Sequence, residues 1–431
     1  MSAATVPHAR DVDAPTTARP KVSVKTPVVY ALAALVTLAL LLPGVGADES
    51  TTFQFSAGAE WFSLPNLTVP ALMTLVVLTV VMAAAAAWAF VLVRQRRHAP
   101  PWLHVVVGLA FVLAFLTYAG AGKTSVIPMV SLLAGALALS VPLVFGALSG
   151  VICERSGIIN IAIEGQLLFG AFAAAVTASA LGSGYWGLIA APVAGALVGA
   201  LLAWFAVSYQ VNQIIVGVVL NTLILGLTGF LFATVLSDNK ALWNTRMPLP
   251  RLRIPVLAEI PVLGPVLFNQ TVLIYLMYVI VVVLNVMLFR SRWGLRTRAV
   301  GEHPKAADTV GIKVNVRRVW NTILGGAVAG LGGAFFTVGS GLAFGREMSA
   351  GTGFIALAAM ILGKWNPYGA VAAALLFGFS KNLGNVLSTI GSGVPSELLL
   401  MLPYLITIFA VAGFVGRVRP PAAEGIPYTK S

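Results

Sequence analysis

Long runs of apolar residues, separated by short polar segments, recur along almost the whole chain. Many of these runs reach the length of about 18 residues with which an α-helix can cross the hydrocarbon core of a bilayer. A membrane β-barrel would instead show segments of about ten residues with alternating polarity, and no such segments are visible in the sequence. The pattern predicts an all-α, polytopic membrane protein with about 10–12 transmembrane helices.

The ends of the apolar runs place the individual spans. The run at residues 353–363 is too short to cross a bilayer alone, so we expect half a helix or a re-entrant element there. The first run ends in small residues, as a signal peptide does, but the long polar tail before it favours an uncleaved span. The expected spans are residues 28–42, 67–93, 102–119, 127–150, 157–181, 186–209, 214–236, 271–289, 319–338, 353–363, 368–388 and 398–415.

Basic residues between the spans predict the orientation. Arg94, Arg96 and Arg97 follow the second span, and the loop 290–318 carries eight lysines and arginines. Positively charged loops stay in the cytoplasm, and an even number of spans separates these two clusters, so both clusters and both termini are expected to be cytoplasmic. The loop 237–270, which this count places outside, conflicts with the rule because it carries four basic residues.

Composition and charge exclude several classes of protein. The chain is 58% hydrophobic and 10% charged, with a formal net charge of +13. Much of the positive charge lies in short loops between spans, which suits membrane orientation better than a nucleic-acid surface. The four histidines show no metal-ligand spacing, and the single Cys153 lies in an apolar stretch. We therefore expect no nucleic-acid partner, no metal site, no catalytic residues and no enzyme activity.

One short segment imitates a nucleotide-binding loop. Gly122, Lys123 and Thr124 match the end of a phosphate-binding loop, but Thr117 occupies the position of its first glycine. The segment also follows a membrane span rather than a strand. We therefore expect this chain to bind no nucleotide or other cofactor itself, and any ATP to be used by a partner subunit.

Polar residues embedded in apolar segments are candidates for a substrate pathway. Ionisable groups at the centre of a membrane helix cost about 2.5–3.5 kcal/mol on insertion scales, so they tend to face a polar interior or one another. Glu154, next to Arg155, is also compatible with a loop at the membrane surface, and Asn221 with helix packing. Asn382 adjoins a second embedded polar residue, Lys381. The candidate pathway residues are Glu154, Asn160, Glu164, Asn221 and Asn382.

The loop 290–318 contains the signals of a short helix. Pro304 suits the first helical turn, Ala306 and Ala307 favour a helix, and Gly311 suits its end. The sequence therefore predicts a short helix on the cytoplasmic surface.

The segment 154–165, which contains Glu154, Asn160 and Glu164, and the loop 290–318 together resemble the inner-membrane permeases of ABC importers for nucleosides and simple sugars. This group includes branched-chain amino-acid permeases. The likeness spans about residues 127–427 and is strongest for nucleoside-type permeases, through the segments 154–165, 402–407 and 424–428. Residues 305–311 match the family pattern E-A-A-x-x-x-G except that Lys305 replaces the acid.

The resemblance implies a domain organisation. Residues 121–418 would form the permease core, with a cytoplasmic coupling loop at 290–318. Additional transmembrane helices at 27–120 would precede the core, with a disordered cytoplasmic tail at 1–26 and a cytoplasmic C-terminal tail at 419–431. The residues that would couple the chain to a separate ATPase subunit are Gly301, Glu302, Lys305, Ala306, Ala307 and Gly311.

The resemblance also implies partners and a function. The partners are an ABC ATPase subunit, a second, distinct permease subunit and an extracytoplasmic substrate-binding lipoprotein, all at the bacterial plasma membrane. The expected function is import of nucleosides. Simple sugars of the ribose or galactose type, and branched-chain amino acids, are the alternative substrates. A secondary transporter or channel is the alternative of another class, and it would need an inverted repeat or its own coupling-ion site.

Overall fold

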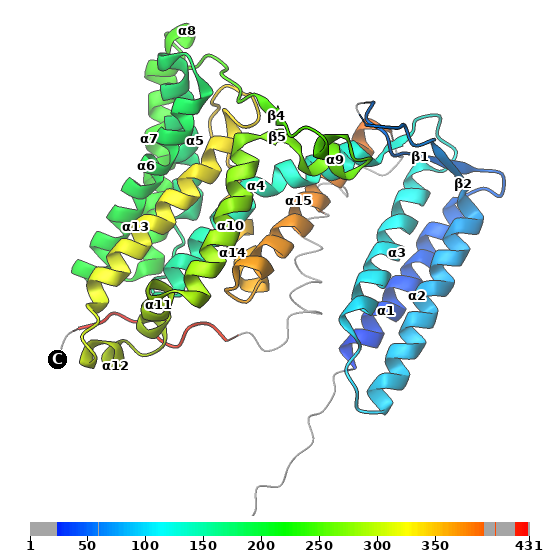
Figure 1. The fold of residues 1–431 in the computed structure, drawn as a ribbon, viewed down its shortest axis with the longest axis horizontal. Helices are drawn as coiled ribbons and strands as arrows, with labels where there is room; N and C mark the ends of the chain where they lie inside the picture. Colours follow the sequence, from blue (N-terminus) through cyan, green and yellow to red (C-terminus); the bar gives the residue numbers. More distant parts are fainter. Residues whose placement is uncertain (1–23, 59, 392–400, 402–418, 430–431) are drawn as a thin grey trace, which may run out of the picture. The chain divides into compact units, whose positions relative to one another are not determined.

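The computed structural model describes residues 24–58, 60–391, 401 and 419–429. The chain divides into two compact units (Figure 1). Unit 1 comprises residues 1–48 and 71–118, and unit 2 comprises residues 49–70 and 119–431. Within the described residues, ten helices are long and apolar enough to cross a membrane. This confirms the predicted all-α, polytopic fold.

Unit 1 is built from three long helices. Tyr30 and Ala34 on the first helix pack against Met82 and Ala89 on the second. The outward side chains of the second helix, such as Met73, remain exposed, as is typical of helices surrounded by lipid. The helices are α1 (Lys25–Val36), continued by η1 (Thr37–Leu41) and η2 (Leu42–Gly44), α2 (Ala71–Arg94) and α3 (Pro101–Gly120).

Unit 2 is assembled around one helix, α4 (Met129–Glu154). In the most apolar stretch of this helix, 89% of the residues are buried. Helices α13, α14 and α15 pack directly against it. The other helices are α5 (Ile163–Leu181), α6 (Gly184–Ala203), η3 (Trp204–Ser208), α7 (Gln213–Leu231), η4 (Phe232–Leu236), α8 (Lys240–Trp243), η5 (Leu257–Glu259), α9 (Leu263–Leu267), α10 (Val272–Arg290), α11 (Arg292–Glu302), α12 (Pro304–Thr309), α13 (Val314–Gly333), η6 (Ala334–Phe336), α14 (Thr352–Leu362) and α15 (Pro367–Thr389).

The predicted spans and the observed helices differ most at two places. The span expected at 157–181 begins as a helix only at Ile163, because Ser156–Ala162 form a non-helical break after α4. The span expected at 319–338 begins five residues early, at Val314. The segment 353–363 is the short helix α14, as expected. The span expected at 398–415 and nearly all of the expected tail 1–26 lie outside the described residues.

Short strands, which the apolar pattern did not reveal, lie in the segments between the helices. β1 (Ser50–Gln54) pairs antiparallel with β2 (Leu67–Pro70) and parallel with β3 (Ile127–Pro128). β4 (Arg251–Arg253) pairs antiparallel with β5 (Asn269–Thr271). In Figure 1, β4, β5, α8 and α9 lie at one end of unit 2, and α11 and α12 lie at the other. The loops 237–270 and 290–318 are therefore on opposite ends, as the count of spans predicted.

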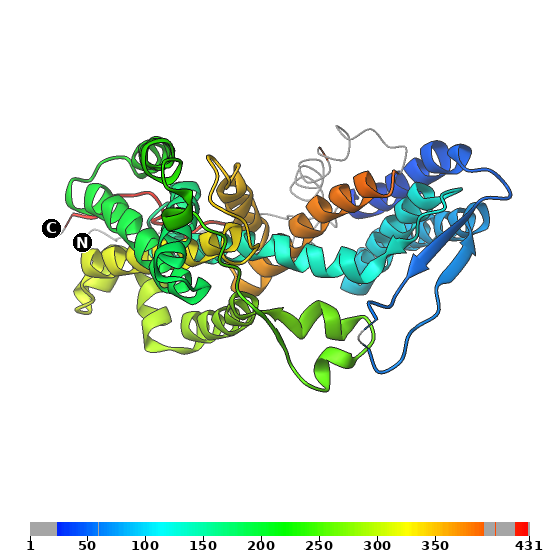
Figure 2. The same cartoon turned by 90° about the horizontal axis from the view of Figure 1, so that it is seen from above.

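Two glycine pairs let α6 and α13 pack closely, and the two helices run alongside each other in both views (Figure 2). A Cβ at Gly195 would lie 2.6 Å from Gly330 Cα, and one at Gly199 would lie 2.6 Å from the carbonyl oxygen of Thr322. Gly326 contacts Gly195 and Gly199 in turn. Four-residue spacing places both glycines of each helix on one face, and this face is where α6 and α13 meet.

A third glycine pair joins α4 to α14. A Cβ at Gly146 would lie 2.7 Å from Ala356 Cβ, and one at Gly150 would lie 2.5 Å from Met360 Sδ. Any larger side chain on this face of α4 would displace α14. The short helix is therefore held against the centre of unit 2.

Candidate functional site

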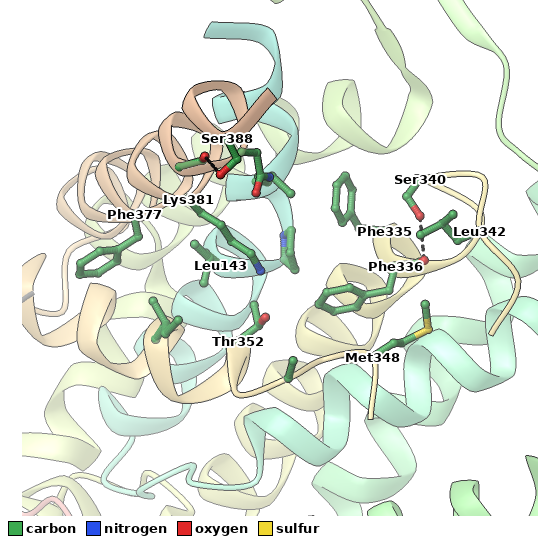
Figure 3. A pocket seen from close by; sticks show the side chains of 16 residues that line it. Leu143, Phe335, Phe336, Ser340, Leu342, Met348, Thr352, Phe377, Lys381 and Ser388 are labelled. Carbon is green, nitrogen blue, oxygen red and sulfur yellow. Dashed lines mark hydrogen bonds between the residues drawn. The ribbon is translucent and has the colours of Figure 1, made fainter. Parts of the chain in front are cut away.

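A cavity of about 440 Å³ opens in unit 2 between α4, α14, α15 and the segment that follows α13 (Figure 3). Most of its wall is apolar, with a few hydroxyl, amide and ammonium groups, a composition typical of small-molecule sites. The lining residues are Leu139, Pro142, Leu143, Phe335, Phe336, Ser340, Leu342, Met348, Ala350, Thr352, Ile355, Phe377, Lys381, Gly384, Asn385 and Ser388.

One wall of the cavity is a polar stripe on α15. Lys381, Asn385 and Ser388 are spaced at i, i+4 and i+7, so they share a helix face, and all three are exposed in this chain. In Figure 3 the Lys381 side chain extends from α15 toward the N-terminal end of α14, near Thr352. Polar groups on a membrane helix mark water-filled paths or partner contacts. This stripe gives the cavity its hydrogen-bonding capacity.

The opposite wall consists of aromatic rings and flexible apolar side chains. The rings of Phe335 and Phe336 lie 6.1 Å apart between centroids, with their planes at 71°, and Met348 and Leu342 continue the surface. Aromatic faces and a polarisable thioether accommodate flat apolar groups. The cavity thus has one wall that can bind a flat apolar group and an opposite wall that carries a row of hydrogen-bonding groups.

The predicted pathway residue Glu164 holds the start of α14. Its Oε1 accepts hydrogen bonds from Ser349 Oγ at 2.6 Å and from the Gly351 amide at 2.8 Å, and its Oε2 accepts one from the Gly353 amide at 2.6 Å. A carboxylate at a helix N-terminus satisfies amides that lack helical partners and interacts favourably with the helix dipole. Glu164 therefore positions Thr352, which lines the cavity.

Asn160 belongs to a closed side-chain network in the break after α4. Its Nδ2 donates to Ser149 Oγ and to Gln166 Oε1, both at 3.0 Å, and its Oδ1 accepts from Gln166 Nε2 at 3.2 Å. All three side chains are fully buried. Nearby, Gln213 Oε1 accepts from the Ile159 amide at 2.7 Å. Of these contacts, the bond from Ile159 to Gln213 satisfies a backbone amide in the break, and the others join side chains to one another.

Glu154 and Asn221 lie on the two sides of the same break. Glu154 is 3% exposed, and its Oε2 accepts a 2.5 Å hydrogen bond from Trp365 Nε1. Asn221 Nδ2 donates to the Ile161 carbonyl at 2.9 Å, and its Oδ1 accepts from the Gly165 amide at 2.8 Å. Asn221 thereby joins α7 to the first turn of α5.

Asn382, the fifth predicted pathway residue, joins α15 to α4. Its Nδ2 donates to the carbonyl oxygens of Leu132 at 2.8 Å and Ser131 at 3.3 Å, and a Cβ at Gly135 would overlap its amide. None of the five predicted residues lines the cavity in the described structure. A role for them in transport stays a prediction.

The cavity residues that sequence reasoning missed carried a usable signal. Lys381 and Asn382 form a pair of embedded polar residues and a weaker candidate for the polar interior, and only Lys381 of the pair lines the cavity, because consecutive residues on a helix face different directions. The spacing of Lys381, Asn385 and Ser388 marks one polar face on an otherwise apolar span. Phe335 and Phe336 offered no such signal, because aromatic residues are common throughout the spans.

The predicted coupling loop forms two helices rather than one. The expected short helix is α12, which begins at Pro304, and Gly311 follows it with a left-handed φ of +82°. The loop also contains α11. Exposure divides the six predicted coupling residues. Glu302, Lys305, Ala306 and Gly311 are exposed, whereas Gly301 and Ala307 are buried within the chain.

A surface groove of about 540 Å³ adjoins these helices. Arg296, Lys313 and Arg317 contribute positive charge to it, and Trp320, which is 65% exposed, contributes an apolar surface. Such a groove can bind a partner surface of acidic and apolar character.

Metal chemistry has no visible basis in the described part of the chain. No three histidine, cysteine or carboxylate side chains come together there in an arrangement that could hold a metal ion. The free Cys153 is buried on α4.

Comparison with known proteins relates the chain to a transport family. A family model described as the permease component of branched-chain amino acid transport systems matches residues 132–411. The matched region contains the cavity, the break after α4 and helices α11 and α12. No solved structure matches the chain.

Individual relatives are permease proteins with stated substrates. The guanosine ABC transporter permease protein NupQ of Bacillus subtilis is 39% identical over 305 residues, covering 68% of this chain and 95% of NupQ. The nucleoside ABC transporter permease protein NupC of Lactococcus lactis is 38% identical over 309 residues, covering 70% and 97%. A putative glucose ABC transporter permease protein of Haloferax volcanii, TsgC13, is 32% identical over 240 residues, covering 55% and 71%.

Proposed function

This chain belongs to the permease-component family of branched-chain amino acid transport systems, and from that membership we propose that it carries nucleosides across the bacterial plasma membrane as part of an ABC importer. The chain is a multi-pass permease subunit and not an enzyme, since ATP hydrolysis in such systems belongs to a separate ATPase subunit.

The observation that carries the substrate proposal is the two-sided cavity. A nucleoside has a flat base, which suits the surface of Phe335 and Phe336, and a ribose with several hydroxyl groups, which suits Lys381, Asn385 and Ser388. The match with guanosine and nucleoside permeases over almost their whole length supports the same substrate class.

Uptake of radiolabelled nucleosides tests the proposal. The chain would be co-expressed with the ATPase, second permease and binding lipoprotein of the same transport system, in cells that lack nucleoside uptake. We expect ATP-dependent accumulation of guanosine or another nucleoside, and competition by unlabelled nucleosides. Accumulation of glucose or ribose without nucleosides would contradict the proposed substrate.

Glucose is a second candidate, favoured by the 32% identity with a putative glucose permease. Sugars lack a flat aromatic base, so they would use the polar stripe more than the aromatic wall. Replacing Phe336 by leucine should weaken nucleoside uptake more than sugar uptake, which separates the two candidates.

The partners in this proposal are an ABC ATPase, a second and distinct permease subunit, and an extracytoplasmic binding lipoprotein. No cofactor is bound by this chain, and ATP is used by the ATPase. The ATPase would contact the exposed residues Lys305 and Ala306 on α12 and the adjoining groove with Arg296 and Arg317. This end of unit 2, with both termini, would be cytoplasmic.

A matched pair of substitutions tests the ATPase contact. Ala306 and Ala241 are both exposed on short helices, but they lie on α12 and α8, at opposite ends of unit 2. A306W should prevent co-purification of the ATPase, whereas A241W should leave it unchanged. Equal recovery of the ATPase with both variants would place the contact elsewhere.

A further inference from the structure

The C-terminal segment 419–429 is tied to the end of unit 2 that carries the coupling helices. In Figure 1 this segment, drawn in red, runs past α11 and α12. It has no helix or strand of its own, so its conformation depends on contacts with the rest of the chain. Those contacts reach three separate structures: the break after α4, the pair α11 and α12, and the start of α13.

A buried arginine forms the first contact. Arg318 on α13 is 1% exposed, and its Nη1 donates to the Ile426 carbonyl at 2.7 Å while its Nη2 donates to the Ala423 carbonyl at 3.4 Å. Desolvating a guanidinium is costly unless its donors are satisfied. The two backbone carbonyls of the segment satisfy Nη1 and Nη2, whereas Nε has no partner among the described residues. The segment and α13 therefore stabilise each other.

Backbone hydrogen bonds at two glycines form the second contact. The Ala423 amide donates to the Gly301 carbonyl at 2.8 Å, and the Gly425 amide donates to the Gly157 carbonyl at 3.1 Å. Gly157 has φ +93°, and a Cβ there would lie 2.6 Å from Arg318 Nη2. One short stretch of chain therefore bridges α11 and the break after α4.

A buried aromatic side chain forms the third contact. Tyr428 is 9% exposed and packs with Val300 on α11, Ala307 on α12 and Val314 on α13. Its hydroxyl lies near the carboxylate of Asp308. Ala307, one of the residues expected to contact an ATPase, is buried by this tyrosine instead. The segment thereby holds α12 from the inner side.

A carboxyl pair forms the fourth contact. Glu424 lies close enough to Glu154 for their carboxyl groups to interact, and Glu154 also accepts the hydrogen bond from the indole of Trp365. Arg155, next to Glu154, donates through Nε to the Trp365 carbonyl at 3.0 Å. Trp365 lies in the turn between α14 and α15, the two helices whose opposite ends form the cavity wall.

We propose that residues 419–429 act as a strap that transmits movement of α11 and α12 to the break after α4 and to the turn between α14 and α15. Without the strap, α12 contacts the rest of the chain through few side chains, because it has only six residues. With the strap, a displacement of α12 by an ATPase moves Tyr428 and the segment joined to it. This inference rests on the proposed coupling role of α11 and α12.

A cysteine in the cavity gives a readout that does not depend on the substrate. The one natural cysteine, Cys153, is fully buried, so an N385C variant would carry the only accessible thiol in the described part of this chain. In the assembled complex, ATP should change the labelling rate of N385C by about threefold or more. Deletion of residues 419–431 should abolish that change while ATP hydrolysis continues.

Single substitutions within the strap provide the matched control. Tyr428 is buried and Ile426 is 55% exposed, so Y428A should uncouple ATP hydrolysis from the labelling change, whereas I426A should not. A synthetic peptide of residues 419–431, added to the deletion variant, should restore the change, and a scrambled peptide should not.

Two outcomes would overturn the strap. The first is an ATP-dependent labelling change that persists in both the deletion variant and Y428A. The second is a loss of complex assembly in both variants with a normal labelling change per ATP in the fraction that assembles, which would make the segment a stabiliser only. A wild-type complex that responds to ATP but does not take up nucleosides would contradict the proposed substrate and leave the strap supported.

Discussion

Two polar regions of unit 2 look alike in the sequence and differ in the structure. The break after α4 and the first turn of α5 contain Asn160 and Glu164, and α15 contains Lys381 and Asn385, all embedded among apolar residues. In the first region, the polar side chains form hydrogen bonds with other groups of the protein. On α15, Lys381 and Asn385 are exposed to a cavity. The difference shows that a polar side chain within a membrane span needs a hydrogen-bonding partner, and that this partner can be another group of the same protein.

The largest effect is expected from removing the carboxylate of Glu164. E164A should destabilise the protein by about 3 kcal/mol, because it leaves buried polar groups without a partner. Thermal unfolding in detergent measures the change. E164Q, which keeps one acceptor oxygen, should lose less. E347A, an exposed carboxylate in the same connection before α14, should have little effect, and an equal loss in E347A would contradict the capping role.

The second effect separates transport from stability. K381A and N385A should each reduce nucleoside uptake by about tenfold, or about 1.4 kcal/mol, without lowering the melting temperature. L376A is the control, because Leu376 is exposed on the same helix but does not line the cavity. Unchanged uptake in both polar variants would remove the cavity from the transport pathway.

A third measurement compares how residues act within each region. Asn160 and Gln166 share two hydrogen bonds, so a double-mutant cycle with alanine should give a coupling energy of about 1 kcal/mol in unfolding. The same cycle on Lys381 and Asn385, which share no described hydrogen bond, should give nearly additive changes. Additivity at Asn160 and Gln166 would show that the network is not a structural unit.

The smallest effect concerns pH at the inner end of the break. Burial raises the pKa of Glu424, and the interaction with Glu154 opposes this shift only in part. The docked segment therefore binds the proton more tightly than the free segment. Docking is most stable below the ordinary pKa of about 4.5 and weakens as the pH rises from there through the raised pKa.

Hydrogen exchange can detect this pH dependence. Protection of the Ala423 and Gly425 amides, corrected for intrinsic rates, should decrease as the pH rises through this window. Glu154, Glu302, Asp308 and Arg318 are charged groups that face the segment, and none of them is altered in E424Q. The E424Q variant keeps a neutral side chain at every pH, so its protection should depend less on pH than that of the wild type. A wild-type protection that does not change would show that the carboxyl pair does not control docking.

The sequence by itself determined the membrane class and nearly all span positions. The length of an apolar run is a local property, and the bilayer imposes the rest. The short helix at Pro304 and its end at Gly311 were also local, since proline and glycine restrict the backbone wherever they occur.

Only the tertiary structure decided which polar residues face a cavity and which are hydrogen-bonded inside the protein. Asn382 and Lys381 are adjacent in the sequence, yet one binds α4 and the other enters the cavity, because the rotation of α15 is set by packing against several helices at once. The C-terminal segment depends on Arg318, more than 100 residues earlier in the chain. Contacts between residues so far apart in the sequence form only when the whole unit has folded, so no local sequence pattern predicts them.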